Sequence, residues 1–117
     1  MDVVLLATDL MVVSRVQGAA AQVGAAIKVA ASESQAVQLC RDANADLLIV
    51  DLATPTISLE PIRQMTTNST RVTRIVAFGP HVHEDRLQSA REAGCDLVVS
   101  RGRFFNEVDA ILREGAI

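Results

Sequence analysis

The sequence predicts an α/β domain in which a parallel sheet of five strands is covered by helices on both faces. Two observations lead to this prediction. Five short runs rich in Val, Ile and Leu are nearly continuous in apolar residues, as expected of strands buried on both faces of a parallel sheet. The segments between them are longer and place apolar residues three and four positions apart, which is the helical period. A chain of 117 residues has the usual size of one domain, so we expect residues 1–117 to form a single domain.

The predicted strands alternate with predicted helices along the chain. The strands are expected at residues 3–7, 27–30, 47–50, 74–78 and 97–99. The first helix is expected from Leu10 to Val23, and Gly24 stops it. The second opens at Ser32, where Gln35 is placed to complete a capping box.

Three further helices complete the pattern. Ile57, Ile62 and Met65 mark the third helix, and Pro61 is expected in its first turn because proline is tolerated only there. The fourth helix is expected over residues 84–93 and the fifth over residues 105–114. Each of these two is followed by a glycine suited to a C-cap, Gly94 and Gly115. Five strands alternating with five helices predict a doubly wound α/β/α sandwich of the flavodoxin-like kind.

Composition and charge argue against several classes of partner. Aromatic residues make up only 3% of the chain, so stacking on nucleobases is not expected. The net charge of −3 and the pI near 5.2 give no electrostatic reason to expect nucleic acid or an anionic membrane. No basic leader and no apolar segment of ~20 residues is visible, so the sequence predicts a cytoplasmic protein. In that reducing compartment we expect Cys40 and Cys95 to be buried thiols that form no disulfide.

Asp51 is the most informative residue of the chain. It follows the most apolar run, residues 47–50, and Pro55 stands four residues later. A carboxylate at the end of a parallel strand lies at the edge of the sheet where open α/β folds place their sites. Residues 51–55 (DLATP) and 94–100 (GCDLVVS) resemble two motifs of the receiver domain of two-component response regulators. These are the phosphoacceptor Asp followed by Met-Pro, and the Gly-Ala-Asp run into the fifth strand. The resemblance covers the whole chain and implies that Asp51 stands at the phosphoacceptor position.

The resemblance also implies where a metal ion would be held, and the residues there have changed. Receivers hold a divalent cation with an acidic pair after the first strand, which neutralises charge during phosphoryl transfer. The matching positions are Ala7 and Thr8, or Thr8 and Asp9 if the first loop is shifted by one residue. In either alignment at least one acidic metal ligand is missing.

Three other receiver positions have also changed. Gly79 stands where receivers have a Thr or Ser whose hydroxyl binds a phosphoryl oxygen. Arg101 replaces the lysine that ends the fifth strand, and its planar guanidinium has a different reach. Val98 matches the aromatic switch position and has no ring to move on phosphorylation. Among the residues that carry receiver chemistry, only Asp51 is retained.

We therefore interpret the chain as a stand-alone pseudo-receiver. It would be a non-enzymatic domain of a two-component phosphorelay, acting by protein–protein interaction without phosphorylation and without a cofactor. Loss of a metal ligand and of an electrostatic donor commonly costs on the order of 10²-fold each in rate. Three alternatives stay open. The first is a conventional regulator phosphorylated on Asp51, with Mg²⁺ held by Asp9 and Asp51. The second is a small-molecule binder on the same fold, although residues 7–10 lack the glycines that cradle phosphates. The third is a structural subunit.

The partner surface is implied by the resemblance alone. In receivers, the fourth helix, fifth strand and fifth helix form the face used for dimers or targets. Here that face would bind another signalling protein or a second copy of the chain. We expect Phe104 to be its exposed anchor, because Phe105 falls on the buried stripe of a helix over residues 105–114. The candidate interface residues are Arg86, Arg91, Val98, Arg101, Arg103 and Phe104.

Two histidines and two arginines are expected near Asp51. His81 and His83 are interpreted as a solvated loop pair that caps the fourth helix, because no third ligand stands at a readable spacing. Arg101 or Arg103 is expected to pair with Asp51, since a carboxylate at a strand end without a metal needs a countercharge.

Overall fold

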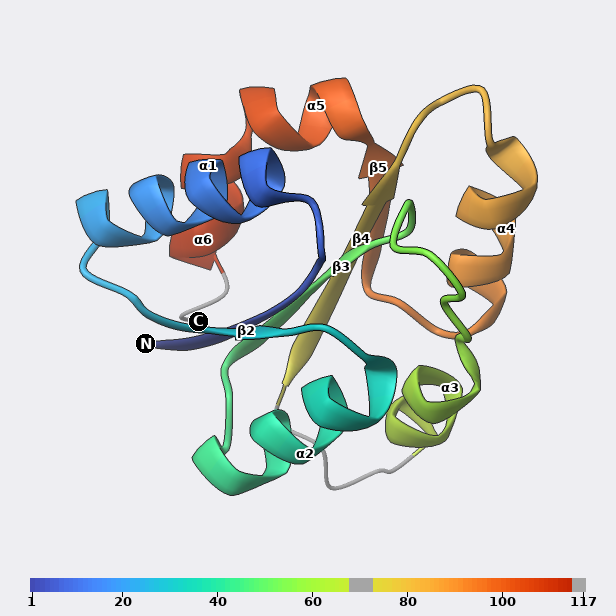
Figure 1. Ribbon diagram of the computed structural model, residues 1–117, viewed down its shortest axis with the longest axis horizontal. Helices are drawn as coiled ribbons and strands as arrows, with labels where there is room; N and C mark the ends of the chain where they lie inside the picture. Colours follow the sequence, from blue (N-terminus) through green and yellow to red (C-terminus); the bar gives the residue numbers. More distant parts are fainter. Residues whose placement is uncertain (68–72, 115–117) are drawn as a thin grey trace.

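The five strands form a single parallel sheet in the predicted arrangement. The computed structural model describes residues 1–67 and 73–114. The strand order is β2-β1-β3-β4-β5, and all neighbouring pairs are parallel (Figure 1). This order is flavodoxin-like, so the predicted fold class is confirmed. The strands are β1 (Asp2–Leu6), β2 (Ala26–Ala30), β3 (Leu47–Asp51), β4 (Arg74–Gly79) and β5 (Leu97–Ser100).

Helices cover both faces of the sheet. One face carries α1 (Leu10–Gln22), α5 (Arg101–Asn106) and α6 (Val108–Glu114), as Figure 1 shows. The other face carries α2 (Glu33–Ala43), α3 (Glu60–Thr66) and α4 (Glu84–Glu92). None of the helices in the described part of the chain is long and apolar enough to cross a membrane.

Each strand sends alternate side chains into two separate cores. On β1, Val3 and Leu5 join the core beneath α1, α5 and α6, whereas Val4 and Leu6 join the core beneath α2, α3 and α4. Every residue of β3 is buried. A strand with both faces covered has no solvent-facing positions, which explains why the predicted runs are continuous rather than alternating.

The predicted helix starts are confirmed where a local cap specifies them. The Ser32 hydroxyl accepts a hydrogen bond from the Gln35 N–H at 3.2 Å. The Gln35 side chain turns back as predicted, but it accepts from the Ala31 N–H at 3.0 Å, one residue before the cap. Pro61 lies in the first turn of α3, as expected. Ile57, which was predicted to mark this helix, instead precedes it and packs on the core from the loop.

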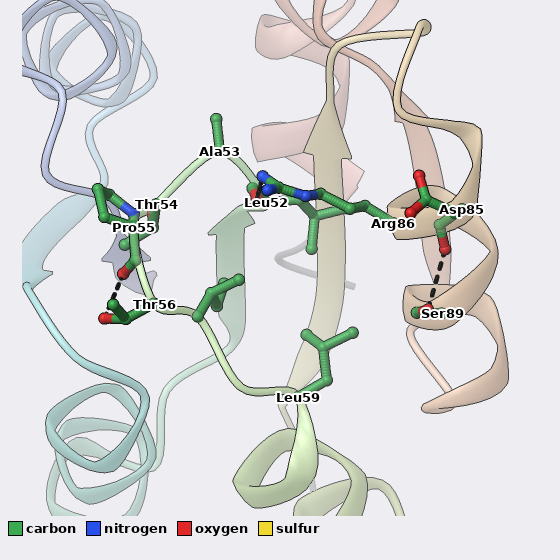
Figure 2. A pocket seen from close by; sticks show the side chains of 10 residues that line it. Leu52, Ala53, Thr54, Pro55, Thr56, Leu59, Asp85, Arg86 and Ser89 are labelled. Carbon is green, nitrogen blue, oxygen red and sulfur yellow. Dashed lines mark hydrogen bonds between the residues drawn. The ribbon is translucent and has the colours of Figure 1, made fainter.

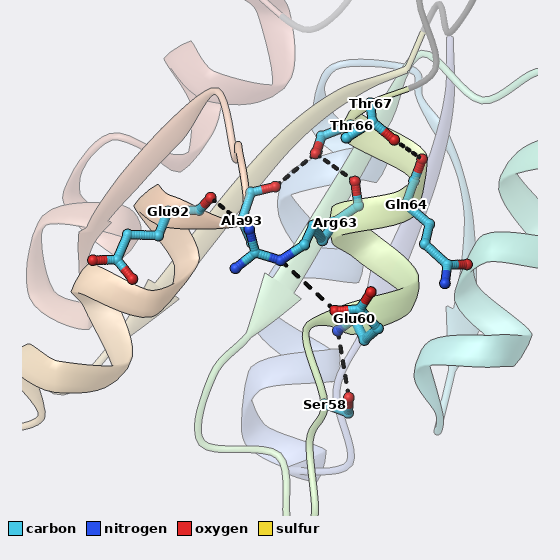
Figure 3. Close-up of polar contacts among 8 residues, drawn as sticks. All are labelled: Ser58, Glu60, Arg63, Gln64, Thr66, Thr67, Glu92 and Ala93. Atoms are coloured by element: carbon cyan, nitrogen blue, oxygen red, sulfur yellow. Dashed lines mark hydrogen bonds and ion pairs between the residues drawn. The ribbon is translucent and has the colours of Figure 1, made fainter.

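Gly94 follows the end of α4, and two features of the structure require glycine at this position. Its φ of +95° is one that L side chains rarely adopt, and a Cβ there would lie 2.7 Å from Thr66 Oγ1. Figure 3 shows how Thr66 and Arg63 of α3 reach the end of α4. Thr66 Oγ1 lies 2.6 Å from the Ala93 carbonyl, and Arg63 Nη1 donates to the Glu92 carbonyl at 3.3 Å. These contacts fix α4 before the chain enters β5.

The predicted fifth helix is wrong in its start and in its continuity. Helix α5 begins at Arg101 and ends at Asn106, and α6 follows from Val108. The earlier start comes from Ser100, whose side chain accepts from the Arg103 N–H at 3.2 Å and so caps α5. The predicted end of the helix at Gly115 lies outside the described residues.

This shift of the helix start reverses the expected roles of two phenylalanines. Phe104 is fully buried, at 0% exposure, and Phe105 is half-buried. Phe105 was placed on the buried stripe by counting three positions back from Val108, which assumes that one helix contains both Phe105 and Val108. Because α5 and α6 are separate helices, the buried stripe of α6 does not continue into α5. Phe104 is therefore a core residue, and its predicted role as an exposed anchor is wrong.

Candidate functional site

Asp51 lies at the carboxyl edge of the sheet, as predicted, inside a closed turn. Its side chain is only 2% exposed. The Ala53 N–H donates to Asp51 Oδ1 at 2.9 Å. Thr54 binds the Asp51 carbonyl twice, through its N–H at 3.1 Å and its hydroxyl at 2.7 Å. The β3–α3 loop therefore folds over the carboxylate.

Burial raises the pKa of the Asp51 carboxyl above its ordinary value. The bond from Ala53 and the positive charge of Arg101 lower this pKa, and the negative charge of Asp9 raises it further. The net shift is upward, so the turn disfavours the charged form of Asp51.

Arg101 pairs with Asp9 rather than with Asp51, which corrects the prediction. Arg101 Nη2 lies 3.7 Å from Asp9 Oδ2, while Arg103 pairs with Glu107 at 3.0 Å. As the first residue of α5, Arg101 lies opposite the loop that carries Asp9. Arg103 lies on the exposed side of α5, four residues before Glu107. Arg101 therefore lowers the pKa of Asp51 by its positive charge at a distance, and the described contacts include no direct ion pair between the two residues.

The three residues that could match the acidic pair offer a poor metal site. Ala7 is buried and has no side-chain ligand, and Thr8 is exposed. Asp9 is the N-cap of α1: its Oδ1 accepts from the Met11 N–H at 2.8 Å, and its Oδ2 faces Arg101. Within residues 1–67 and 73–114, no group of three or more His, Cys, Asp or Glu side chains could hold a metal ion. Asp9 is the one carboxylate among these three positions, and it is already engaged by the α1 cap and by Arg101.

Gly79 ends β4 next to Asp51, and its missing side chain is replaced by neighbours. A Cβ on Gly79 would meet Leu52 Cβ at 3.2 Å and Leu87 Cδ2 at 3.7 Å. Leu52 is itself buried, and its N–H donates to the Phe78 carbonyl at 2.9 Å. Sequence reasoning noted the absent hydroxyl but missed Leu52, because its contact with Gly79 depends on strand pairing.

A pocket of about 470 Å³ opens between the β3–α3 loop and α4. Figure 2 shows Arg86 of α4 reaching across this pocket toward Leu52. Arg86 Nη1 donates to the Leu52 carbonyl at 3.2 Å, which links α4 to the residue after Asp51. Thr54, Thr56 and Ile57 form the loop side of the pocket, and Asp85 and Ser89 the helix side.

The two histidines lie in the loop before α4, where they were predicted. His81 is exposed, and His83 precedes the first residue of the helix. The carbonyl of His83 accepts from the Arg86 N–H at 3.0 Å, but its side chain does not cap the helix. Its Nδ1 atom is buried without a hydrogen-bond partner among the described residues.

The predicted interface residues lie on α4, β5 and α5, and apart from the buried Phe104 they are exposed or half-buried. Arg91 pairs with Glu84 at 2.9 Å along α4, and Arg103 pairs with Glu107 at the end of α5. Val98, at the switch position, is half-buried and packs on the core beneath α2, α3 and α4. Arg91 and Arg103 therefore each have an acidic partner within the chain, whereas Arg86 binds the Leu52 carbonyl.

Known structures share this fold. No family model matches the sequence, and no curated protein matches it. The chain is similar to a DNA-binding response regulator of the LuxR family from Staphylococcus aureus, with 14% identity, a TM-score of 0.80, and coverage of 99% of this chain and 98% of that one. It is similar to the chemotaxis response regulator CheY4 of Vibrio cholerae, with 16% identity, a TM-score of 0.79 and coverage of 97% of each chain. It is also similar to a response regulator protein from Burkholderia multivorans, with 21% identity, a TM-score of 0.72, and coverage of 94% of this chain and 93% of that one.

At these identities the likeness establishes the fold. The chain has the fold of response-regulator receiver domains, with Asp51 ending β3 at the carboxyl edge of the sheet.

Proposed function

We propose that the chain is a receiver-like signalling domain of a two-component or phosphorelay system that acts by protein–protein contact, without phosphorylation of Asp51 and without enzymatic activity. The observation that carries this proposal is the closed state of the Asp51 site. The carboxylate is 2% exposed and held by the Ala53 N–H, and Leu52 fills the space beside Gly79.

Electrostatics supports the same proposal. A phosphoryl group would add about −1.5 to −2 charges at a carboxylate whose pKa burial already raises. The nearby cation, Arg101, is shared with Asp9 at 3.7 Å. Without a metal site to neutralise the added charge, the acyl phosphate would lack the stabilisation that phosphoryl transfer needs.

The test is exposure to a small phosphodonor. The purified protein is incubated with acetyl phosphate and millimolar Mg²⁺, alongside a conventional receiver as positive control, and both are weighed by intact mass spectrometry. We expect phosphoryl addition to the control only. A stable adduct that Asp51→Asn removes would instead establish the conventional response regulator.

We further propose that partners dock on the face formed by α4, β5 and α5. β5 is an edge strand of the sheet, and an unpaired edge beside a half-buried apolar residue suits protein docking. The candidate contact residues are Arg86, Arg91, Val98 and Arg103.

Sedimentation can test this face for self-association, and co-purification can test it for a second protein. Val98→Glu should weaken either interaction by at least ~10-fold, because it places a charge at the centre of the face. The matched control is Ile27→Glu on β2, the opposite edge strand, where a half-buried apolar residue also lies. Equal effects of the two substitutions would show that the loss comes from general damage to the sheet edge.

A further inference from the structure

The three phenylalanines of the chain form one cluster under α5. Phe78 and Phe104 stack with ring centroids 4.2 Å apart and an interplanar angle of 12°. Phe105 packs edge-on against both, at 5.6 Å from Phe78 and 5.0 Å from Phe104. Since Phe78 and Phe104 are fully buried, they fix the position of the Phe105 ring at the surface.

Two arginines from distant parts of the chain converge on this ring. The guanidinium carbon of Arg15, from α1, lies 3.9 Å from the Phe105 centroid, and that of Arg101, from α5, lies 6.0 Å from it. Figure 1 shows α1 and α5 on the same face of the sheet. A guanidinium stacked on a ring keeps its N–H donors in its own plane, where they can still bind an acceptor. The Phe105 ring therefore holds the N–H donors of the two arginines in position to bind a ligand.

These two charges are only partly neutralised. Arg15 has no acidic partner among the described residues, and Arg101 has Asp9 at the longer ion-pair distance of 3.7 Å. Two like charges held on one aromatic ring repel each other, although the chain as a whole carries a net charge of −3. An anion between them would relieve that repulsion.

A pocket of about 480 Å³ opens beside the two guanidiniums. In addition to Arg15, Arg101 and Phe105, its wall includes His81 and Asn106, which carry polar side chains. None of the described residues that line it is acidic, and Asp51 is not among them. The chemistry of the wall therefore selects a negatively charged ligand rich in hydrogen-bond acceptors.

We propose that this cavity, the α1–α5 pocket, binds an oxyanion, either a phosphate or a carboxylate group of a small ligand. Both groups match the planar donor edge of arginine, which binds such oxygens in pairs. Asp51 does not line this pocket, so the proposal goes beyond the function proposed for the Asp51 site.

The experiment titrates the full chain with two probes, inorganic phosphate and succinate, and follows backbone amide shifts by NMR at constant ionic strength. We expect saturable binding of at least one probe, with the largest shifts at α5 and the start of α1. Arg15→Gln and Arg101→Gln should each weaken binding by about 10-fold, as expected for loss of a charge-assisted hydrogen bond. Arg41→Gln, on exposed α2 across the sheet, is the matched control and should leave affinity unchanged.

Two further variants act without removing a pocket arginine. A Cβ on Gly102 meets no atom within 4 Å, so Gly102→Leu should fold normally yet fill the pocket and weaken binding. Asp9→Asn keeps an efficient N-cap for α1 but removes the carboxylate that competes for Arg101. It should tighten binding severalfold, an effect that mere damage to the fold does not produce.

The two probes distinguish the source of the oxyanion. Binding of phosphate alone assigns the site to a phosphorylated ligand, and binding of succinate alone assigns it to a carboxylate ligand. Binding of both supports the shared oxyanion chemistry. The proposal is overturned if neither probe saturates, if the Arg15 and Arg101 variants bind as well as the Arg41 variant, or if Gly102→Leu leaves binding unchanged.

Discussion

Leu52 occupies the side of Gly79 on which a side chain would stand, since a Cβ there would lie 3.2 Å from Leu52 Cβ. Leu52 cannot easily move away, because its N–H donates to the Phe78 carbonyl and its carbonyl accepts from Arg86. The hydroxyl that conventional receivers carry at this position is therefore absent, and the space for it is filled. Changing one residue would not restore a phosphoryl-binding group here.

We predict that Gly79→Thr destabilises the protein by ~1–3 kcal/mol through overpacking against Leu52. Adding Leu52→Ala should recover part of the loss caused by the threonine, so the double variant should be more stable than the sum of the single changes predicts. Urea denaturation of the wild type, the two single variants and the double variant measures the coupling free energy between positions 52 and 79. Strict additivity would show that Leu52 does not restrict position 79. Gly18→Ala, at a helical glycine with open space around it, is a control and should be neutral or stabilising.

Asp51→Asn should raise the melting temperature at pH 7. Burial raises the pKa of Asp51 from its ordinary value of 3.8, so between 3.8 and the raised value the folded protein binds more protons than the unfolded chain. Stability therefore falls as pH increases through that window. Asn removes the buried charge and keeps an oxygen to accept from Ala53. We expect a gain of about 4 °C at pH 7, as for ~1 kcal/mol in a domain of this size.

The gain from Asp51→Asn should disappear below about pH 4, where the wild-type carboxyl is protonated in both states. Calorimetric scans from pH 3 to pH 8 measure this dependence. Asp42→Asn, on the exposed side of α2, serves as the control and should show no such gain. A wild type that melts above the Asp51 variant at pH 7 would mean that the charged form is stabilised.

Phe104→Ala should destabilise the fold far more than Phe105→Ala. Phe104 is fully buried and stacks on Phe78 at 4.2 Å, so its truncation leaves a core cavity and should cost ~3–5 kcal/mol. Phe105 is only half-buried, so its loss removes less buried apolar surface, together with its edge contacts to Phe78 and Phe104 and its contact with Arg15. Chemical denaturation of the two variants gives the comparison. The reverse ranking would restore the helix phase that the sequence pattern first suggested.

Cys40 should be inert in the folded protein. Burial raises the pKa of its thiol to about 11, and the reactive thiolate is therefore scarce at neutral pH. In a Cys95→Ser variant, where Cys40 is the single cysteine, a colorimetric disulfide reagent at pH 8 should react only as fast as the protein opens. The same variant in concentrated urea should react at once. Rapid reaction without denaturant would show that α2 does not cover Cys40 as described.

Local sequence patterns predicted most of the fold, because they record interactions between near neighbours. Continuous apolar runs predicted all five strands to within one residue at most ends, and the run before Asp51 placed this carboxylate at the edge of the sheet. Gly94 was predicted as a cap, and its φ of +95° confirms the reason for glycine there. The start of α5 was missed because Ser100, which follows the predicted strand at residues 97–99, was not considered as a helix cap.

The contacts that distinguish the Asp51 site and the α1–α5 pocket could only be found in the tertiary structure. Leu52 against Gly79, Arg101 beside Asp9, and Arg15 over Phe105 each join residues more than 25 positions apart in the chain. Residue types and spacing predict which element carries a side chain, and often which face. Which of several possible partners that side chain meets depends on strand register, helix phase and side-chain rotamer, and these are settled together when the layers pack.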